Sequence, residues 1–171
     1  MNVIIETDRL LLRTFTMDDV DLIFKLNNDS NVTRFTYDPI EQHEQARQIL
    51  ENIIIPQYAL YNHGRWAVHV KPNLEFIGWC GLKYRPERNE VDLGYRFIPS
   101  SWNKGYATEA AYACLKHGFE KLNMKKITGR AVPENHGSLR VLEKIGMQFS
   151  REEVVDGHKS RTYEAENPSI R

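Results

Sequence analysis

The sequence predicts one α+β domain, built on a central mixed, mostly antiparallel sheet flanked by helices. Its 171 residues match the size of one ordinary domain and contain no repeat or linker. Three strand-like segments at 65–71, 75–84 and 90–98 follow one another through short turns, which is typical of an antiparallel meander. A helix then separates 90–98 from a further strand at 125–132, which favours a right-handed parallel crossover. The strands at that single parallel step are expected to splay.

The N-terminal third is predicted to hold one strand and two helices. Residues 9–15, RLLLRTF, read as the strand. Residues 16–19, TMDD, look like a capping box that opens a short helix. A second helix begins near Glu41, because apolar residues recur there at helical spacing. Pro56 should kink or end that helix, since proline lacks the N–H that a helix interior needs.

The segment 100–110, SSWNKGYATEA, leads into the clearest helical pattern in the chain. The first turn of a helix has unpaired N–H groups and partial positive charge, so it can bind an anion. Gly105 and Ala107 are small enough for a phosphate to reach the backbone, Lys104 adds charge, and Thr108 can donate its hydroxyl proton. The alternative is a helix whose small residues only permit close packing on the sheet, and the loop by itself does not decide between the two.

The C-terminal part is predicted to contain a strand, a short helix and a hairpin. The strand covers 125–132 and the helix 135–145. The hairpin strands, 147–155 and 158–164, meet at Asp156-Gly157, which is a strong two-residue turn signal.

Composition limits the classes of function. Lysine plus arginine and aspartate plus glutamate both number 23, so the formal net charge is zero. A general nucleic-acid binder needs a strong basic excess, so nucleic acid is not an expected partner. No apolar run is long enough to span a bilayer and no secretory signal is visible, so neither a membrane nor export is expected. The expected location is the cytoplasm.

The cysteines and histidines give no sign of redox or metal chemistry. Cys80 and Cys114 both lie in apolar patterns, which is typical of reduced, buried thiols. The six histidines show no spacing that is characteristic of metal ligands. No metal is therefore expected.

Three stretches, taken together, resemble one family. Residues 93–110, LGYRFIPSSWNKGYATEA, resemble motif A of the GNAT superfamily of N-acetyltransferases, [RQ]-x-x-G-x-[GA], with Trp102, Gly105 and Ala107 at the three defined positions. The tryptophan departs from the general pattern and is similar to the W-x-x-G-Y-A-T-E-A form of the RimJ/RimL-like branch. Residues 135–147, NHGSLRVLEKIGM, resemble motif B. The first strand and the last hairpin also look like that branch, so the resemblance spans 1–171 as a single domain.

The resemblance implies a GNAT-like acyl-CoA N-acyltransferase fold and direct transfer of an acetyl group from acetyl-CoA to a primary amine in a ternary complex. The splayed strands at 90–98 and 126–132 should hold the pantetheine arm, and the first turn after Trp102 should wrap the pyrophosphate. The implied coenzyme A contacts are Phe97, Ile98, Trp102, Asn103, Lys104, Gly105, Tyr106, Ala107, Thr108, Asn135 and Ser138.

The catalytic expectations follow from what the reaction needs. Asp92 matches an acidic position of the family and is the first candidate for a base, acting directly or through water. A solvated strand carboxylate is the alternative reading of Asp92. The oxyanion donor should be a backbone N–H near Phe97, freed by a bulge. Leu142 stands where much of the superfamily has a tyrosine acid, so Ser138 is the replacement candidate. Hydrogen bonding at the start of its helix, where serine is favoured, is the alternative reading of Ser138. Glu109 is expected only to stabilise its helix.

The acceptor remains open among a protein α-amino group, a polyamine, an amino acid and an amino-sugar drug. Five residues are expected to line its pocket, namely Arg34, Phe35, Tyr37, Tyr58 and Tyr84. A non-catalytic acyl-CoA-binding sensor of the same fold and a purely structural domain are the competing hypotheses. Either a monomer or a homodimer is compatible with the sequence.

Overall fold

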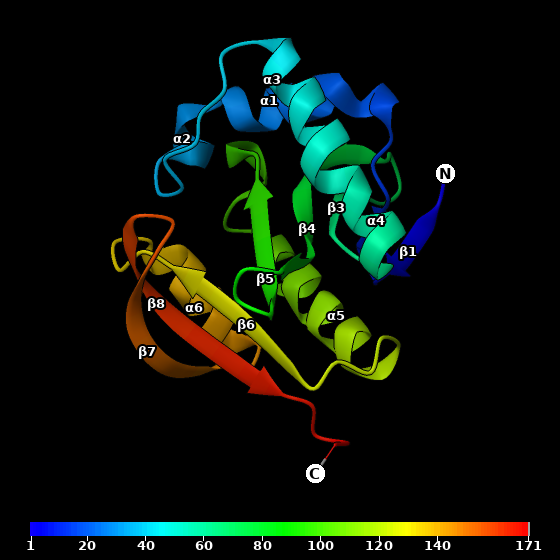
Figure 1. Ribbon diagram of the computed structural model, residues 1–171. Helices are drawn as coiled ribbons and strands as arrows, with labels where there is room; N and C mark the ends of the chain where they lie inside the picture. The colour runs from blue at the N-terminus through cyan, green and yellow to red at the C-terminus, as the bar shows by residue number, and fades with distance from the viewer. Residues whose placement is uncertain (171) are drawn as a thin grey trace.

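The computed structural model describes residues 1–170, and these form a single eight-stranded sheet with helices on both faces (Figure 1). The strands are β1 Val3–Glu6, β2 Leu10–Arg13, β3 Arg65–Val70, β4 Glu75–Arg85, β5 Glu90–Phe97, β6 Lys126–Ala131, β7 Gln148–Val155 and β8 His158–Glu166. The α-helices are α1 Val20–Asn28, α2 Ser30–Thr33, α3 His43–Ile49, α4 Ile55–Tyr61, α5 Tyr106–Glu120 and α6 His136–Lys144, with short 3-10 turns at Met17–Asp19 and Pro99–Ser101.

The sheet is mixed and mostly antiparallel, as predicted. Its strand order is β1-β2-β3-β4-β5-β6-β8-β7, and β5 with β6 is the one parallel pair among these strands. The helix α5 makes the crossover between them. The turn at Asp156-Gly157 has φ values of 52° and 82°, the left-handed conformation that a two-residue hairpin requires.

The parallel step is splayed, because β5 and β6 pair over only two positions. Asp92 is opposite Thr128 and Leu93 is opposite Gly129. Beyond these pairs β5 continues to Phe97 and β6 to Ala131 without pairing to each other. In Figure 1 the green arrow of β5 and the yellow arrow of β6 diverge toward their arrowheads. A gap therefore opens in the middle of the sheet.

The two faces of the central strands have different coverings. Cys80 and Leu82 of β4 face α5, where the Cys114 Sγ lies 3.6 Å from the Cys80 Sγ. Both cysteines are buried and unoxidised, as predicted. Because side chains alternate along a strand, Trp79 and Lys83 face the opposite side, toward the helices between residues 43 and 61. The core thus has one layer on each side of the sheet.

Two N-terminal predictions were wrong in detail. The predicted first strand at 9–15 is the second arm of a hairpin, because the short segment Val3–Glu6 already forms an antiparallel strand beside it. Of the two outcomes predicted for Pro56, a kink or the end of the second helix, the end does not occur. The helix passes through a π-helical turn at Leu50–Ile54 and continues as α4, in whose first turn Pro56 lies. A proline is tolerated there because the first-turn N–H groups need no intrahelical acceptor.

Candidate active site

A cavity of about 370 Å³ runs through the gap between β5 and β6. Its lining includes Asp92 and Gly94, which face the α3–α4 side of the sheet, and Tyr95, which faces the α5 side. Ser138 of α6 lines it as well. Since residues from both faces line one space, the cavity connects the two sides of the sheet.

The outer walls of the cavity come from the segment 35–38, the π-helical turn and the β7–β8 hairpin. The Tyr37 and His158 rings stack with centroids 4.2 Å apart, so they join two of these walls. Of the predicted acceptor-pocket residues, Phe35 and Tyr37 line the cavity. The other three, Arg34, Tyr58 and Tyr84, are not among its lining residues. Tyr58 is instead structural, since its hydroxyl donates to the Arg65 carbonyl.

Phe97, the last residue of β5, and Ile98, which follows it, differ in what their backbones can bind. The Ile98 N–H donates to the Ile77 carbonyl at 2.8 Å, so its N–H is already used inside the sheet. Peptide groups alternate along an antiparallel pair, so those of Phe97 and Tyr95 point away from β4 and toward the gap. The β4–β5 register is regular throughout, which means that the predicted bulge near Phe97 is wrong. The Phe97 N–H lacks a strand partner because β6 has diverged from β5 at this point, and not because of a bulge.

Trp102 fastens the loop that follows β5. Its indole N–H donates to the Phe97 carbonyl at 2.7 Å, although 43% of the residue's surface is exposed. This hydrogen bond brings the start of the loop back onto the end of the strand. Asn103 then takes a positive φ of 62°, which turns the chain toward the helix.

The start of α5 is held by the β1–β2 hairpin. Arg9 donates from Nη1 to the Lys104 carbonyl at 2.8 Å and from Nε to Glu109 at 2.7 Å, and Thr7 also donates to Glu109. Burial opposes ionisation of Glu109, but the hydrogen bonds from Thr7 and Arg9 outweigh it and lower the pKa of the carboxyl. Glu109 therefore has the structural role that the sequence predicted.

Gly105 is the residue before α5, with a φ of 81° in the left-handed region. The first hydrogen bond of the helix runs from the Glu109 N–H to the Gly105 carbonyl at 3.0 Å. The N–H groups of Tyr106, Ala107 and Thr108 consequently have no acceptor within the helix. This turn is not part of the cavity lining, so it lies outside the space that Asp92 and Ser138 share.

Asp92 is buried and held by arginines, so the reading of a solvated strand carboxylate is wrong. Arg65 donates from Nη2 to the Asp92 Oδ2 at 3.0 Å. Arg85 and Arg130 approach the same carboxylate to 3.6 and 3.9 Å. Gly94 makes room for this arrangement, because a Cβ there would lie 2.4 Å from the Arg65 guanidinium.

Ser138 lies at the start of α6, where two residues orient it. The Asn135 side-chain oxygen caps the helix by accepting the Ser138 N–H at 3.2 Å. The Tyr95 hydroxyl lies 2.9 Å from the Ser138 Oγ and donates to the carbonyl oxygen of the same residue. The backbone N–H of Ser138 thus takes part in the cap of α6, while its hydroxyl faces Tyr95.

The structure brings Asp92, Asn135 and Ser138 into one cavity, and it leaves the loop and helix start at 102–108 outside that cavity. Sequence reasoning missed Tyr95 and the arginines around Asp92. No cluster of three metal-ligating side chains occurs in residues 1–170. None of the helices in that same range combines the length and apolar character needed to cross a bilayer.

Comparisons with known proteins identify a family for this chain. The model of the acetyltransferase (GNAT) domain family matches residues 9–148. The chain is 34% identical over 148 residues to the uncharacterized protein YkkB of Bacillus subtilis (strain 168), covering 85% of each. It is 31% identical over 150 residues to the uncharacterized N-acetyltransferase YoaA of the same organism, covering 85% of this chain and 82% of that one.

Solved structures share the whole fold. A GNAT-family acetyltransferase from Bacillus anthracis superposes with a TM-score of 0.81 at 25% identity, covering 95% of this chain and 98% of that one. The RimL ribosomal L7/L12 α-N-protein acetyltransferase, solved with coenzyme A, has a TM-score of 0.80 at 16% identity, covering 96% and 98%. At 16% identity, the likeness to RimL shows a shared fold and nothing further.

The chain belongs to the GNAT family of acetyltransferases. It is an acetyl-CoA-dependent N-acetyltransferase, the class that the sequence resemblance implied.

Proposed function

We propose that this enzyme transfers the acetyl group of acetyl-CoA directly to a primary amine in a ternary complex centred on the gap between β5 and β6. The observation that carries the proposal is the single cavity lined from both faces of the sheet. Such a cavity lets a thioester arrive from the α5–α6 side while an amine arrives from the α3–α4 side. The two reactants can then meet without a covalent enzyme intermediate.

The residues present fit coenzyme A. The Phe97 peptide faces the gap, so an extended pantetheine amide could bond there as an added strand would. The NH2 of the Asn135 side-chain amide makes no hydrogen bond within residues 1–170, and it could donate one to the pantetheine arm from the other side. The proposed pyrophosphate site is the loop and first turn of α5, comprising Trp102, Asn103, Lys104, Gly105, Tyr106, Ala107 and Thr108. Ile98 shapes the strand end through its bond to Ile77 rather than by binding the arm through its N–H.

Three groups are proposed to serve the chemistry. Bound acetyl-CoA supplies the thioester carbon that the amine attacks, forming a C–N bond as the C–S bond breaks. The Tyr95 N–H, which faces the gap as the Phe97 N–H does, donates to the thioester oxygen as negative charge builds on it, while the Phe97 N–H is left for the pantetheine arm. Asp92 takes a proton from the amine through water, using the Oδ1 that Arg65 leaves free. Ser138, whose hydroxyl is fixed by Tyr95, donates its proton to the leaving thiolate and takes a proton back from water in the cavity, so that its hydroxyl is restored.

The acceptor is proposed to be either a protein N-terminal α-amino group or a small-molecule amine. The fold shared with RimL, whose name states an α-N-protein acetyltransferase, supports the first choice and the RimJ/RimL-like branch. The stack of Tyr37 on His158 supports a small-molecule amine, because it joins two walls of the cavity and so limits the space for a polypeptide chain.

The test is mass spectrometry of amines incubated with acetyl-CoA and enzyme, using small amines and peptides with free N-termini. An acetylated product that depends on the enzyme is the expected result. A rise in melting temperature with acetyl-CoA but no acetylated amine would instead favour the sensor hypothesis. No rise and no product would leave only the structural hypothesis.

A further inference from the structure

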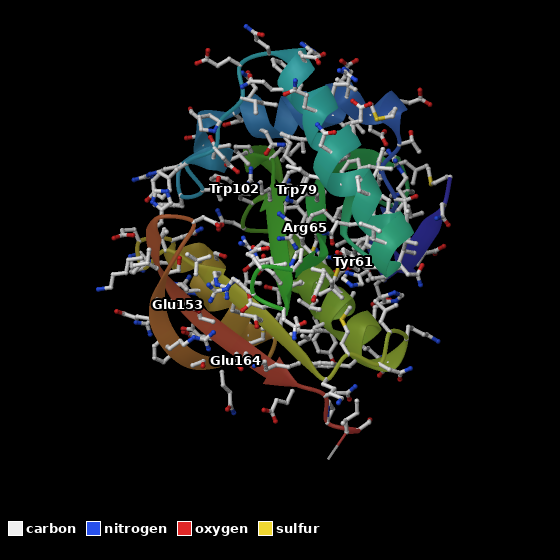
Figure 2. All side chains as sticks on the ribbon, in the orientation of Figure 1. Tyr61, Arg65, Trp79, Trp102, Glu153 and Glu164 are labelled. Carbon is white, nitrogen blue, oxygen red and sulfur yellow. The ribbon has the colours of Figure 1, made fainter. Side chains whose placement is uncertain are left out.

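The wall of the cavity on the α3–α4 side is rich in cations. Five lining residues are lysine or arginine, and they come from four neighbouring strands: Arg65, Lys83, Arg85, Arg96 and Arg130. The label of Arg65 lies near the centre of the molecule in Figure 2. Three lining carboxylates, Asp38, Asp92 and Asp156, oppose these cations.

Each of the four arginines has its own carboxylate. The pairs are Arg65 with Asp92 at 3.0 Å, Arg85 with Asp156 at 3.0 Å, Arg96 with Asp38 at 2.6 Å and Arg130 with Glu90 at 2.7 Å. Lys83 is the remaining cation of the wall, and within residues 1–170 its ammonium makes neither an ion pair nor a hydrogen bond. Among the lysine and arginine residues that line the cavity, Lys83 alone has no carboxylate partner.

Lys83 is placed where a ligand can reach it. It is directly opposite Asp92 in the β4–β5 register, on the face that lines the cavity, and it is half-buried. Burial lowers the pKa of its ammonium, and the neighbouring Arg65 and Arg85 lower it further. Asp92 and Asp156 act in the opposite direction, but neither carboxylate comes within ion-pair distance of the amine. A negative group bound beside Lys83 would stabilise its charged ammonium, and would so offset the cost of burial and the repulsion from Arg65 and Arg85.

A second donor on the same wall also lacks an acceptor. The Nε of Arg85 is buried and makes no hydrogen bond within the described chain, since its nearest carboxylate oxygen, on Asp92, is 3.6 Å away. Buried N–H donors are normally satisfied, and leaving one without an acceptor destabilises the folded protein. Lys83 and Arg85 are two residues apart on β4, so their side chains lie on the same face.

We propose that the wall around Lys83 and Arg85 binds an acid group of the acceptor, so that the enzyme acetylates amines that also carry a carboxylate or a phosphate. This inference rests on the proposed acetyl transfer and adds the substrate class. A polyamine is disfavoured, because it would bring further positive charge to a wall that already has one unmatched cation. An amino acid or an aminoalkyl phosphate supplies both the reacting amine and the missing anion.

The experiment compares amines that differ only in the acid group. Each common L-amino acid is tested beside its carboxamide, O-phosphoethanolamine beside ethanolamine, and spermidine as the cationic amine. Acetylated products are quantified by mass spectrometry, and KM is measured for those that react. A charge-assisted hydrogen bond contributes about 1.5–3 kcal/mol, so the acid-bearing member should have a KM at least about tenfold lower. The carboxylate and phosphate arms show which acid the site takes.

The matched variants are Lys83→Met and Lys116→Met, the second being an exposed lysine on α5. Lys83→Met should raise KM for the acid-bearing amine about tenfold and abolish its preference over the amide. Lys83→Arg should restore part of that preference, and Lys116→Met should behave as the wild type. A kcat loss in Lys83→Met with an unchanged KM would overturn the proposal in favour of a role in proton transfer.

Failure of this inference can be told apart from failure of acetyl transfer. Equal acetylation of acids, amides and spermidine would overturn the acid site and leave the proposed function intact. If no amine reacts, calorimetry of the same acid and amide pairs against coenzyme A-saturated protein still tests the wall. Tighter binding of the acid, lost in Lys83→Met, would support the site, whereas equal binding or none would overturn it.

Discussion

The hydroxyl group of Tyr95 lies 2.9 Å from both the hydroxyl and the carbonyl oxygen of Ser138. This contact joins β5 to α6 across the gap in the sheet. Burial raises the pKa of the Tyr95 phenol, so the group is protonated and able to donate at neutral pH. The position of the Ser138 hydroxyl therefore depends on a residue in another element, 43 positions away.

Ser138→Ala should lower kcat about a hundredfold, because a general acid contributes about 10²–10⁴ in rate. Its effect on KM for acetyl-CoA should be much smaller. Tyr95→Phe should lower kcat about fivefold, since it removes one hydrogen bond worth about 1 kcal/mol that orients Ser138. Steady-state kinetics with acetyl-CoA checks both values.

The control for Tyr95→Phe is Tyr112→Phe, because Tyr112 is exposed on α5 and its hydroxyl makes no hydrogen bond within residues 1–170. It should leave kcat and KM unchanged. If Ser138→Ala instead raised KM for acetyl-CoA and left kcat as it was, Ser138 would be a binding contact only.

Gly105→Val should lower both the melting temperature and the affinity for coenzyme A. The φ of 81° at this position costs a residue with a Cβ about 1–2 kcal/mol, and the added Cβ would lie 3.2 Å from the Arg9 guanidinium. Gly105→Asn separates the two effects, because asparagine tolerates left-handed backbone. It should keep most of the stability and still bind coenzyme A about tenfold more weakly by calorimetry. Full affinity in a folded Gly105→Asn protein would remove the pyrophosphate assignment.

Asp92→Asn should reduce turnover more at pH 7 than at pH 9.5, because an amine that is already neutral at high pH needs no base. The asparagine oxygen can still accept from Arg65, so the cation wall should keep its arrangement. A pH–rate profile of both proteins, with melting temperatures as the folding control, makes the comparison. A loss of equal size at every pH would make Asp92 a positioning residue for the arginines.

Glu153 should give the protein a specific sensitivity to acid. Burial alone raises the pKa of Glu153, but hydrogen bonds from Thr162 and Arg88 outweigh it and lower the pKa to about 2. A depressed pKa contributes stability above the unfolded value near 4.5, and that stability is lost as the pH falls toward 2. Figure 2 shows Glu153 on the hairpin side of the molecule.

Glu153→Gln should therefore be less stable than the wild type at pH 6, and the difference should shrink below pH 4.5. Denaturant unfolding across that range measures it, with the exposed Glu75→Gln as the matched control. A stability difference that stays constant down to pH 3 would show that Glu153 acts by packing rather than by its charge.

Most of the sheet could be predicted because alternation and turn residues are local signals. Asp156-Gly157 defines its hairpin in two residues, and the crossover through α5 follows from handedness. The strand Val3–Glu6 was missed because VIIE is short and does not alternate. The π-helical turn before Pro56 was missed because it depends on packing of the whole segment.

The sequence predicts the site residues that belong to recognisable motifs. It does not predict those that come together from elements far apart in the chain. Asp92, Asn135 and Ser138 do share one cavity. The ion pair of Arg65 with Asp92 spans 27 positions and three strands, so no sequence window contains it. One cue was available in Gly94, because a glycine inside a strand leaves space beside it, and the Arg65 guanidinium fills that space.

The most direct test of the central claim is amide hydrogen exchange of Phe97 and Ile98, measured by NMR with and without coenzyme A. The Phe97 N–H faces the gap and has no strand partner, whereas the Ile98 N–H already donates to Ile77. If the gap between β5 and β6 holds the pantetheine arm, Phe97 exchange slows markedly on binding and Ile98 exchange stays slow in both states. Saturating coenzyme A that leaves Phe97 exchange unchanged would contradict the proposed site.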